Sequence, residues 1–323
     1  MRATRVDPGG AIVDQRKDQR KNRLSRAHPA RAHSSRANHA GADPASRLLG
    51  ELTRQVRRTL KSADADAVHD LRVNIRRFSQ AETVFQSSLG AKEHKLRSRL
   101  KKLMALAGAV RDCDITVKLA SKSKWTSATL RSRVEAERRD AEKVLRKSLL
   151  RWLNHNDHAS RIAAPKPAAE GNERRALVSI GKKFFARGEN ATNGATPQQL
   201  HKFRIATKKF RYALELFASI YGPGLKIWLE PIKGIQSRLG DINDYETARH
   251  MVTRLDSSDS NGSGRSRAHK VVADLKKKQR AEVQEFHKLW TAEVAHDWKN
   301  SLLPALRDPT VGLQAPGGKI ATA

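Results

Sequence analysis

Apolar residues recur three or four positions apart through most of the chain, and in no stretch do apolar and polar residues alternate one by one. The first spacing is typical of helices that bury one face, whereas one-by-one alternation is typical of strands. The connections between the expected helices are short, which favours antiparallel bundles. We therefore expect an all-α protein.

The apolar pattern divides into two sets of four expected helices. In the first set they span 44–62, 64–88, about 96–119 and about 128–154; in the second they lie around 176–184, at 197–221, around 228–242 and at about 268–301. A segment rich in proline and alanine between the two sets is typical of a linker. The expected boundaries are a tail at 1–44, a first unit at 45–156, a linker at 157–172, a second unit at 173–303 and a loose C-terminal tail at 304–323.

The stretch from His201 to Tyr221 carries two stripes on one expected helix. The apolar stripe consists of Leu200, Phe203, Phe210, Leu214 and Phe217. The basic stripe lies roughly 110° further round the helix and consists of His201, Arg204, Lys208 and Arg211. Cations held beside a core are costly to desolvate unless an anion compensates them. A basic face that simply contacts solvent is the alternative, and this stretch alone does not exclude it.

The same stretch occurs twice, at a constant offset of 132 residues. From His69 to Phe85 the chain repeats the pattern H-x-x-R-x-x-x-[RK]-[RK]-F-x-x-x-x-x-x-F. Further matched pairs at this offset are Gly108 with Gly240, Asp112 with Asp244, and the expected helix N-caps Asp64 and Thr196. Two copies that keep the same histidine, arginine and basic pair predict a duplicated structural unit.

These residues carry a family resemblance. H-x-x-R followed by two basic residues and an aromatic, and then L-G-x-x-x-D, resembles the motifs of the CHAD domain, which is named for its conserved histidine and α-helical content. The second element is LGDIND at 239–244, with AGAVRD at 107–112 in the first copy, and the resemblance covers roughly residues 45–305. It implies two pseudo-symmetric four-helix bundles around a basic channel that binds inorganic polyphosphate. It also implies association with polyphosphate granules.

Charge limits the partners of the protein. There are 64 Lys and Arg residues against 33 Asp and Glu, a net charge of +31. Such a field attracts polyanions, and charge alone allows nucleic acid, an anionic membrane surface or polyphosphate. No apolar run approaches the roughly 20 residues that span a membrane, and no secretory signal is evident. The single cysteine, Cys113, suits a reducing compartment. We expect a soluble, cytoplasmic, granule-associated protein.

The first 44 residues are expected to be disordered and basic, because they contain almost no large apolar residue to bury. They carry ten basic and four acidic residues, so most of the net charge belongs to the rest of the chain. The tail either solvates the protein or acts as an electrostatic arm for the same polyanion, and the sequence leaves both interpretations open.

A polyphosphate chain offers a row of negative oxygen acceptors and no base to recognise. Its receptor needs many fixed donors in a row, with arginine supplying planar forks and lysine point charges. The expected polyphosphate-binding residues are His69, Arg72, Arg76, Arg77 and Lys101 in the first copy, and His201, Arg204, Lys208, Lys209, Arg211 and Lys233 in the second. The two histidines should resist protonation among cations and gain a proton beside a polyanion. Alternatively, each packs as a neutral ring at a helix crossing.

We do not expect an enzyme. Asp112 and Asp244 lack an acidic or metal-binding partner at useful spacing, so each is expected to hold a basic side chain or to close a helix contact. No metal site or cofactor is expected. The expected function is non-enzymatic binding of inorganic polyphosphate, with nucleic-acid binding as the alternative and polyphosphate processing as a less favoured third. Polyphosphate-metabolising enzymes or granule proteins are candidate further partners, and no membrane partner is expected.

Overall fold

The computed structural model describes residues 44–85, 91–122, 128–156, 172–221, 223–257 and 262–308. Every regular element in these ranges is helical and none is a strand, which confirms the all-α prediction. Nearly all of the expected N-terminal tail and linker, and most of the expected C-terminal tail, lie outside the described residues.

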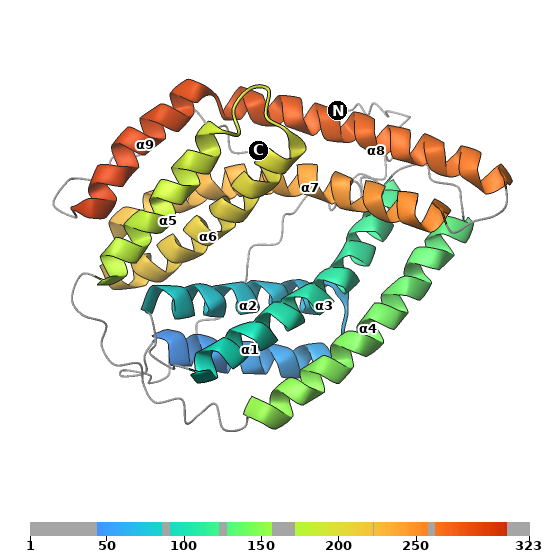
Figure 1. The fold of residues 1–323 in the computed structure, drawn as a ribbon, viewed down its shortest axis with the longest axis horizontal. Helices are drawn as coiled ribbons and strands as arrows, with labels where there is room; N and C mark the ends of the chain where they lie inside the picture. Colours follow the sequence, from blue (N-terminus) through green and yellow to red (C-terminus); the bar gives the residue numbers. More distant parts are fainter. Residues whose placement is uncertain are drawn as a thin grey trace, which may run out of the picture. The chain divides into compact units, whose positions relative to one another are not determined.

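The first half of the fold consists of α1 (Pro44–Lys61), α2 (Ala65–Phe85), α3 (Ala91–Lys122) and α4 (Ala128–Asn156). Each helix packs on the next one in the chain, and α4 also contacts α1 (Figure 1). The four helices therefore enclose one core. Leu71, Ile75 and Phe78 of α2 lie in it and are at most 1% exposed.

The second half consists of α5 (Asn172–Glu189), α6 (Pro197–Tyr221), the short 3-10 helix η2 (Pro223–Trp228), α7 (Leu229–Ser257), α8 (Gly262–Leu289) and α9 (Ala292–Arg307). Helix α5 packs on α6, α6 on α7 and α7 on α8, while α9 packs on α5 (Figure 1). The predicted apolar stripe of α6 is confirmed, because Phe203, Phe210 and Phe217 are all fully buried. Phe184 of α5 stacks on Phe210 with 4.8 Å between ring centroids.

The two motif helices begin at the predicted caps. The Oδ1 of Asp64 accepts a hydrogen bond from the backbone N–H of Ala67 at 2.7 Å. At α6 the bonds are reciprocal: Gln199 N donates to Thr196 Oγ1 at 3.2 Å, and Thr196 N donates to Gln199 Oε1 at 2.7 Å. Such a cap contributes about 1 kcal/mol to stability. It also fixes where each helix starts, and therefore which face carries the basic positions.

The expected helix at 268–301 is two helices, so the prediction of one continuous helix was wrong. Trp290 is fully buried, and its Nε1 donates to the carbonyl of Gly188 at 2.9 Å. Thr291 then leaves the helical conformation (φ −90°, ψ 171°), and its side chain accepts from Val294 N at 3.2 Å to begin α9. The chain bends here because the indole is held in the core and the next residue is a good N-cap.

Helix α9 extends to Arg307, beyond the expected start of the C-terminal tail at 304. The expected helix ended at about 301, and proline lacks the N–H that an interior helical position donates, yet Pro304 lies inside α9. Burial on both sides of the proline holds the helix together: the buried neighbours are Leu302, Leu303, Ala305 and Leu306.

The two halves meet through α2 against α6 and α3 against α7, with further contacts of α2 with α5 and α4 with α7. Cys113 of α3 is part of this junction. It is 1% exposed and packs in a small cluster with Val134 of α4 and Met251 of α7. Burial is the main cause that raises the pKa of its thiol to about 12. The contact between α2 and α6 brings the two motif helices together, while their origin by duplication stays a prediction.

Candidate functional site

Four matched basic positions of α2 and α6 lie close enough to repel one another. Arg76 and Arg204 both act on Arg72, and all three act on Lys208. We call Arg72, Arg76, Arg204 and Lys208 the basic cluster. All four residues are partly buried, and none of them makes an ion pair within the part of the chain that the structure describes. Like charges gathered in this way are unfavourable without an anion, so the cluster is suited to bind one.

Burial lowers the pKa of three members of the basic cluster. Desolvation is the first cause, and repulsion from Arg204 the second, that lower the pKa of Lys208 to about 6. Desolvation followed by repulsion from Arg76 lowers the pKa of Arg72 to about 10. The pKa of Arg204 is lowered as well, again mainly by burial. A bound anion opposes both effects, so the cluster should gain positive charge when it binds one.

Asp112 of α3 and Asp244 of α7 provide opposite charge beside the cluster. Asp112 acts attractively on Arg72, and Asp244 on Arg204. Burial nevertheless raises the pKa of both carboxyls, and for Asp112 the negative charge of Asp244 adds to the rise. Neither aspartate makes an ion pair with a basic side chain among the described residues, so the prediction that each holds a basic side chain stays a prediction.

Arg72 is anchored to α3. Its Nη1 donates to the carbonyl of Met104 at 3.3 Å. The same atom passes Gly108 so closely that a Cβ on that residue would lie 2.8 Å from it. The matched glycine of the first copy therefore makes room for the arginine of the motif.

Arg204 is held differently. Its Nε is buried, and it has no hydrogen-bond partner among the described residues. Gly240, which matches Gly108, has no described atom within 4 Å of the position that a Cβ would take. A buried N–H without a partner costs about 1–3 kcal/mol, so Arg204 has the most to gain from an added acceptor.

The two motif histidines lie at the edge of the cluster. His69 keeps contact with solvent, but partial desolvation and then the charge of Arg111 lower the pKa of its imidazole, as expected among cations. His201 is exposed, and its Nδ1 lies 3.3 Å from Oδ1 of Asn243 on α7. Neither ring is a buried core group, but His201 of α6 contacts α7, so the alternative of a neutral histidine at a helix crossing stays open.

Two predicted residues are engaged with one carboxylate. Arg211 is 9% exposed, and it donates to Gln236 Oε1 at 2.7 Å and to Glu215 Oε1 at 2.5 Å. Arg77 of α2 reaches the other oxygen of Glu215 at 3.5 Å. Glu215 thus links α2 to α6, and both arginines have a structural role there.

The three remaining predicted residues, Lys101, Lys209 and Lys233, are exposed. Lys233 pairs with Glu230 on its own helix at 2.5 Å. None of the contacts recorded for the described residues brings these lysines to the basic cluster, so their role as ligands stays a prediction.

Sequence reasoning missed two cations on α3. The charge of Arg111 acts on His69, Arg72 and Asp244, and Lys118 also acts on Asp244. Arg111 has Asn243 as its counterpart at the constant offset, so a search for matched basic positions passes over it. Its place directly before Asp112, on the helix that packs against α2, was the available signal.

Within the described ranges, no helix is long and apolar enough to cross a bilayer. In the same ranges, no group of three or more His, Cys, Asp or Glu side chains is arranged to hold a metal ion.

Several known proteins resemble this chain in sequence or in fold. Two proteins of Mycobacterium tuberculosis, "Uncharacterized protein MT2285" of strain CDC 1551 / Oshkosh and "Uncharacterized protein Rv2226" of strain ATCC 25618 / H37Rv, are each 25% identical over 248 residues. The aligned part is 68% of this chain and 47% of each relative, so the chain spans about half the length of the curated relatives that it matches.

Two solved structures have a similar fold. The crystal structure of the CHAD domain from the plant Ricinus communis has a TM-score of 0.62 at 21% identity, over 87% of this chain and 96% of that one. PptA from Streptomyces chartreusis has a TM-score of 0.56 at 17% identity, over 78% of this chain and 96% of that one. At these identities the likeness shows the fold. The sequence model of the CHAD domain matches residues 45–253, which is more than half of the chain, and the protein therefore belongs to the CHAD domain family.

Proposed function

We propose that this protein binds inorganic polyphosphate at the basic cluster without processing it. The observation that carries the proposal is the convergence of four partly buried basic side chains from α2 and α6, none of which makes an ion pair among the described residues. Successive phosphates of one chain would each pair with one of these side chains, with the arginines donating through planar forks and the lysine acting as a point charge.

The aspartates support binding rather than a chemical step. The charge of Asp112 acts on Arg72 and that of Asp244 on Arg204, which partly offsets the positive charge of the cluster before a ligand arrives. Burial raises the pKa of both carboxyls. A bound polyanion carries more negative charge than these two groups and would therefore neutralise the cluster more completely.

Competition tests the proposal. Labelled long-chain polyphosphate bound to the full chain is displaced by unlabelled polyphosphate or by duplex DNA at equal phosphate concentration, and polyphosphate should be the stronger competitor. The double variant R76Q/K208Q should lose most of the affinity. The control K202Q/K277Q replaces the same number of basic residues at exposed positions on α6 and α8 and should change little. Equal losses in the two variants would mean that overall charge does the binding, and equal competition by DNA would favour the nucleic-acid alternative.

Salt dependence gives a second readout. Each phosphate that a cation neutralises releases roughly one condensed counterion, so log affinity should fall linearly with log salt, with a slope on the order of −4 to −5 by analogy with DNA. The R76Q/K208Q variant should have a shallower slope than the wild type, because two of the contributing cations are absent. A flat salt response would contradict the proposal.

In cells, we propose that the protein associates with cytoplasmic polyphosphate granules, where polyphosphate-metabolising enzymes or other granule proteins would be its neighbours. A fluorescent fusion should form foci in cells that make polyphosphate and become diffuse in cells that do not. The R76Q/K208Q fusion should be diffuse in both. Foci that persist without polyphosphate would contradict the localisation.

A further inference from the structure

A pocket of about 400 Å³ lies between α6, α7 and α8, next to the basic cluster. One part of its wall is apolar, with Leu200, Leu239, Ile242 and Val283 among the lining residues. This volume is within the range of small-molecule sites, which combine an apolar wall with a few convergent polar groups. The size and the wall are therefore suited to the body of a small organic molecule.

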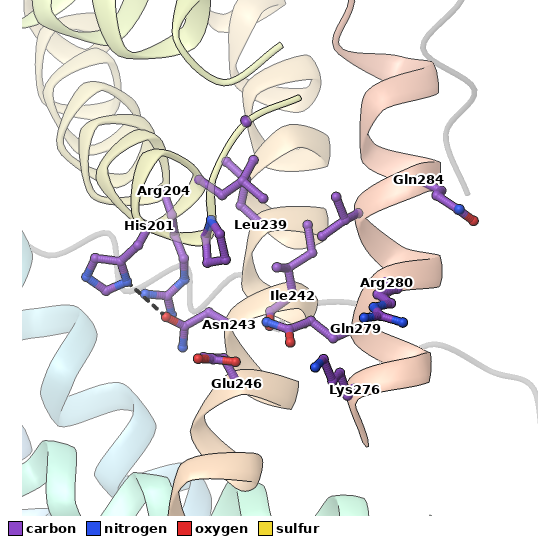
Figure 2. Close-up of a pocket in the computed structure, with 14 residues that line it drawn as sticks. His201, Arg204, Leu239, Ile242, Asn243, Glu246, Lys276, Gln279, Arg280 and Gln284 are labelled. Atoms are coloured by element: carbon purple, nitrogen blue, oxygen red, sulfur yellow. Dashed lines mark hydrogen bonds between the residues drawn. The ribbon is translucent and has the colours of Figure 1, made fainter. Parts of the chain in front are cut away.

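Polar groups gather at two sides of the pocket. Figure 2 shows His201, Arg204 and Asn243 together on the side of α6 and α7, and Lys276 and Arg280 on α8 across from them. Glu246 also lines the pocket, but its carboxylate is bound by Arg249 and His250, and the hydrogen bond from Arg249 is the main cause that lowers its pKa to about 2. The cations Arg204, Lys276 and Arg280 outnumber this one paired acid, so the pocket favours an anion.

Arg204 belongs to both the pocket and the basic cluster. It lines the pocket, its buried Nε lacks a hydrogen-bond partner among the described residues, and its charge acts on Lys208 and Arg72 of the cluster. A ligand whose body fills the pocket can therefore place a negative group on Arg204 and extend further groups of the same kind toward the cluster.

We infer that this pocket binds a nucleoside phosphate, with the base and sugar against the apolar wall and the phosphates on Arg204. The inference rests on the proposed function, because it takes Arg204 as a phosphate ligand. A bare phosphate chain has no apolar body to pack on the apolar part of the pocket wall, whereas a nucleotide has one. Gln279 donates its Nε2 to the carbonyl of Ile242 at 3.5 Å, and its Oε1 is an acceptor for an amino group of a base.

The test compares two ligands with the same phosphate groups. Calorimetric titration of the full chain with ATP and with inorganic tripolyphosphate isolates the contribution of the base and sugar. ATP should bind about tenfold more tightly, which corresponds to about 1.4 kcal/mol. Long-chain polyphosphate should displace ATP, because both need Arg204. Equal or tighter binding of tripolyphosphate would overturn the inference.

A matched pair of variants locates the site. Lys276 lines the pocket, whereas its neighbour Lys277 does not, and both are exposed lysines of α8. K276E should weaken ATP binding several-fold more than K277E, while the two variants should bind polyphosphate alike, because the long-range charge change is the same. Equal effects on ATP would place the nucleotide outside the pocket and overturn the inference.

A variant that narrows the pocket gives an independent readout. Val283 is half-buried in the wall and is not part of the basic cluster. V283F should abolish the preference for ATP over tripolyphosphate and leave polyphosphate affinity unchanged, with a thermal melt to show that the variant is folded. Polyphosphate binding without any preference for ATP would refute this inference alone. ATP binding without polyphosphate binding would instead refute the proposed function.

Discussion

Arg72 on α2 and Arg204 on α6 occupy matched positions of the motif, yet the structure holds them differently. Arg72 donates to the carbonyl of Met104 and lies against Gly108. The buried Nε of Arg204 has no hydrogen-bond partner among the described residues. The guanidinium of Arg72 occupies the space beside Gly108, whereas no described atom lies within 4 Å of the position that a Cβ on Gly240 would take. One arginine is fixed before any ligand arrives, and the other has an unmet hydrogen bond.

This difference shows that a repeated motif does not give two equivalent half-sites. A fixed donor loses little conformational freedom on binding and so supports affinity through preorganisation. A buried donor without a partner instead gains the free energy of a bond that was missing before. We therefore expect substitutions in the first half to change folding and binding together, and substitutions in the second half to change binding more than folding.

The largest expected effect is that of charge reversal at the two arginines. R72E and R204E should each weaken polyphosphate binding on the order of 100-fold, because each removes an attraction and adds a repulsion beside the ligand. The double variant should lose less than the product of the single losses, since both residues contact one ligand. Labelled-polyphosphate titrations give the affinities, with K202E as a control on the exposed face of α6.

Thermal melts of the same variants separate the two halves. R72E should melt at a lower temperature than the wild type because it loses the bond to Met104. R204E should melt closer to the wild type than R72E does, since the buried Nε of Arg204 makes no hydrogen bond among the described residues that the change would remove. Normal binding by both single variants would mean that these arginines are structural only. Equal destabilisation by the two would remove the contrast between the halves.

The next effect concerns the pH dependence of binding and arises mainly at Lys208 of α6, whose counterpart on α2 is an arginine, Arg76. The pKa of Lys208 is lowered to about 6 by burial and by its cationic neighbours. Above pH 6 the free protein must take up a proton at Lys208 to bind a polyanion, so affinity should fall as pH rises from 6 to 8, by at most about tenfold per unit. Titrations at constant ionic strength measure this, and K208M should flatten the profile.

The lowered pKa of Lys208 has the opposite effect on the pH dependence of folding stability. An unfolded lysine keeps its proton up to its ordinary pKa of 10.5, whereas the folded one releases it near 6. The unfolded chain therefore binds more protons between these values, and the stability of the ligand-free protein should rise with pH above 6. A wild-type affinity that does not change between pH 6 and 8 would contradict a depressed pKa at Lys208.

The matched glycines provide a smaller effect. G108A places a Cβ 2.8 Å from Nη1 of Arg72, so the arginine must shift, and we expect polyphosphate affinity to fall several-fold. G240A meets no described atom within 4 Å. It should instead stabilise the helix by about 0.5–1 kcal/mol, which is the difference in helix propensity between alanine and glycine. Denaturant unfolding and binding assays on both variants test these expectations. A larger loss of polyphosphate affinity in G240A than in G108A would contradict the anchoring of Arg72.

The smallest effect is expected at Lys101 and Lys233. Both are exposed, and the pair between Lys233 and Glu230 is of a kind that contributes about 0–1 kcal/mol. K101A and K233A should each change polyphosphate affinity less than about twofold. A tenfold loss in either variant would extend the site along α3 or α7 and support the original prediction for these lysines.

Much of the fold could be predicted because apolar spacing and caps act locally. The stripe through Phe203, Phe210 and Phe217 and the caps Asp64 and Thr196 were sufficient to place α2 and α6. The break at Thr291 was missed for a physical reason. The four-residue spacing of Phe286, Trp290, Val294 and Trp298 continues across it, so the apolar pattern alone does not distinguish one helix from two.

The sequence predicted which residues belong to the candidate site, but not how their side chains are arranged. Matching two copies identifies Arg72 and Arg204, but it does not show which cations already have a partner. The ion pair of Arg211 could have been predicted from the sequence, because Glu215 follows it by four residues on the same helix. The link from Arg77 to Glu215 joins residues 138 positions apart, and only the packed structure reveals it.

The rate at which Cys113 reacts with a thiol reagent can report how often the junction between the halves opens. It is the single cysteine of the chain, and its thiol lies where α3, α4 and α7 pack together. With a pKa near 12 the folded protein contains almost no thiolate, so a thiol reagent should label the chain only when these helices separate. The labelling rate then measures the free energy of that opening. A chain of phosphates bound to α2 and α6 at once should slow the reaction, and shorter chains that contact one helix should not.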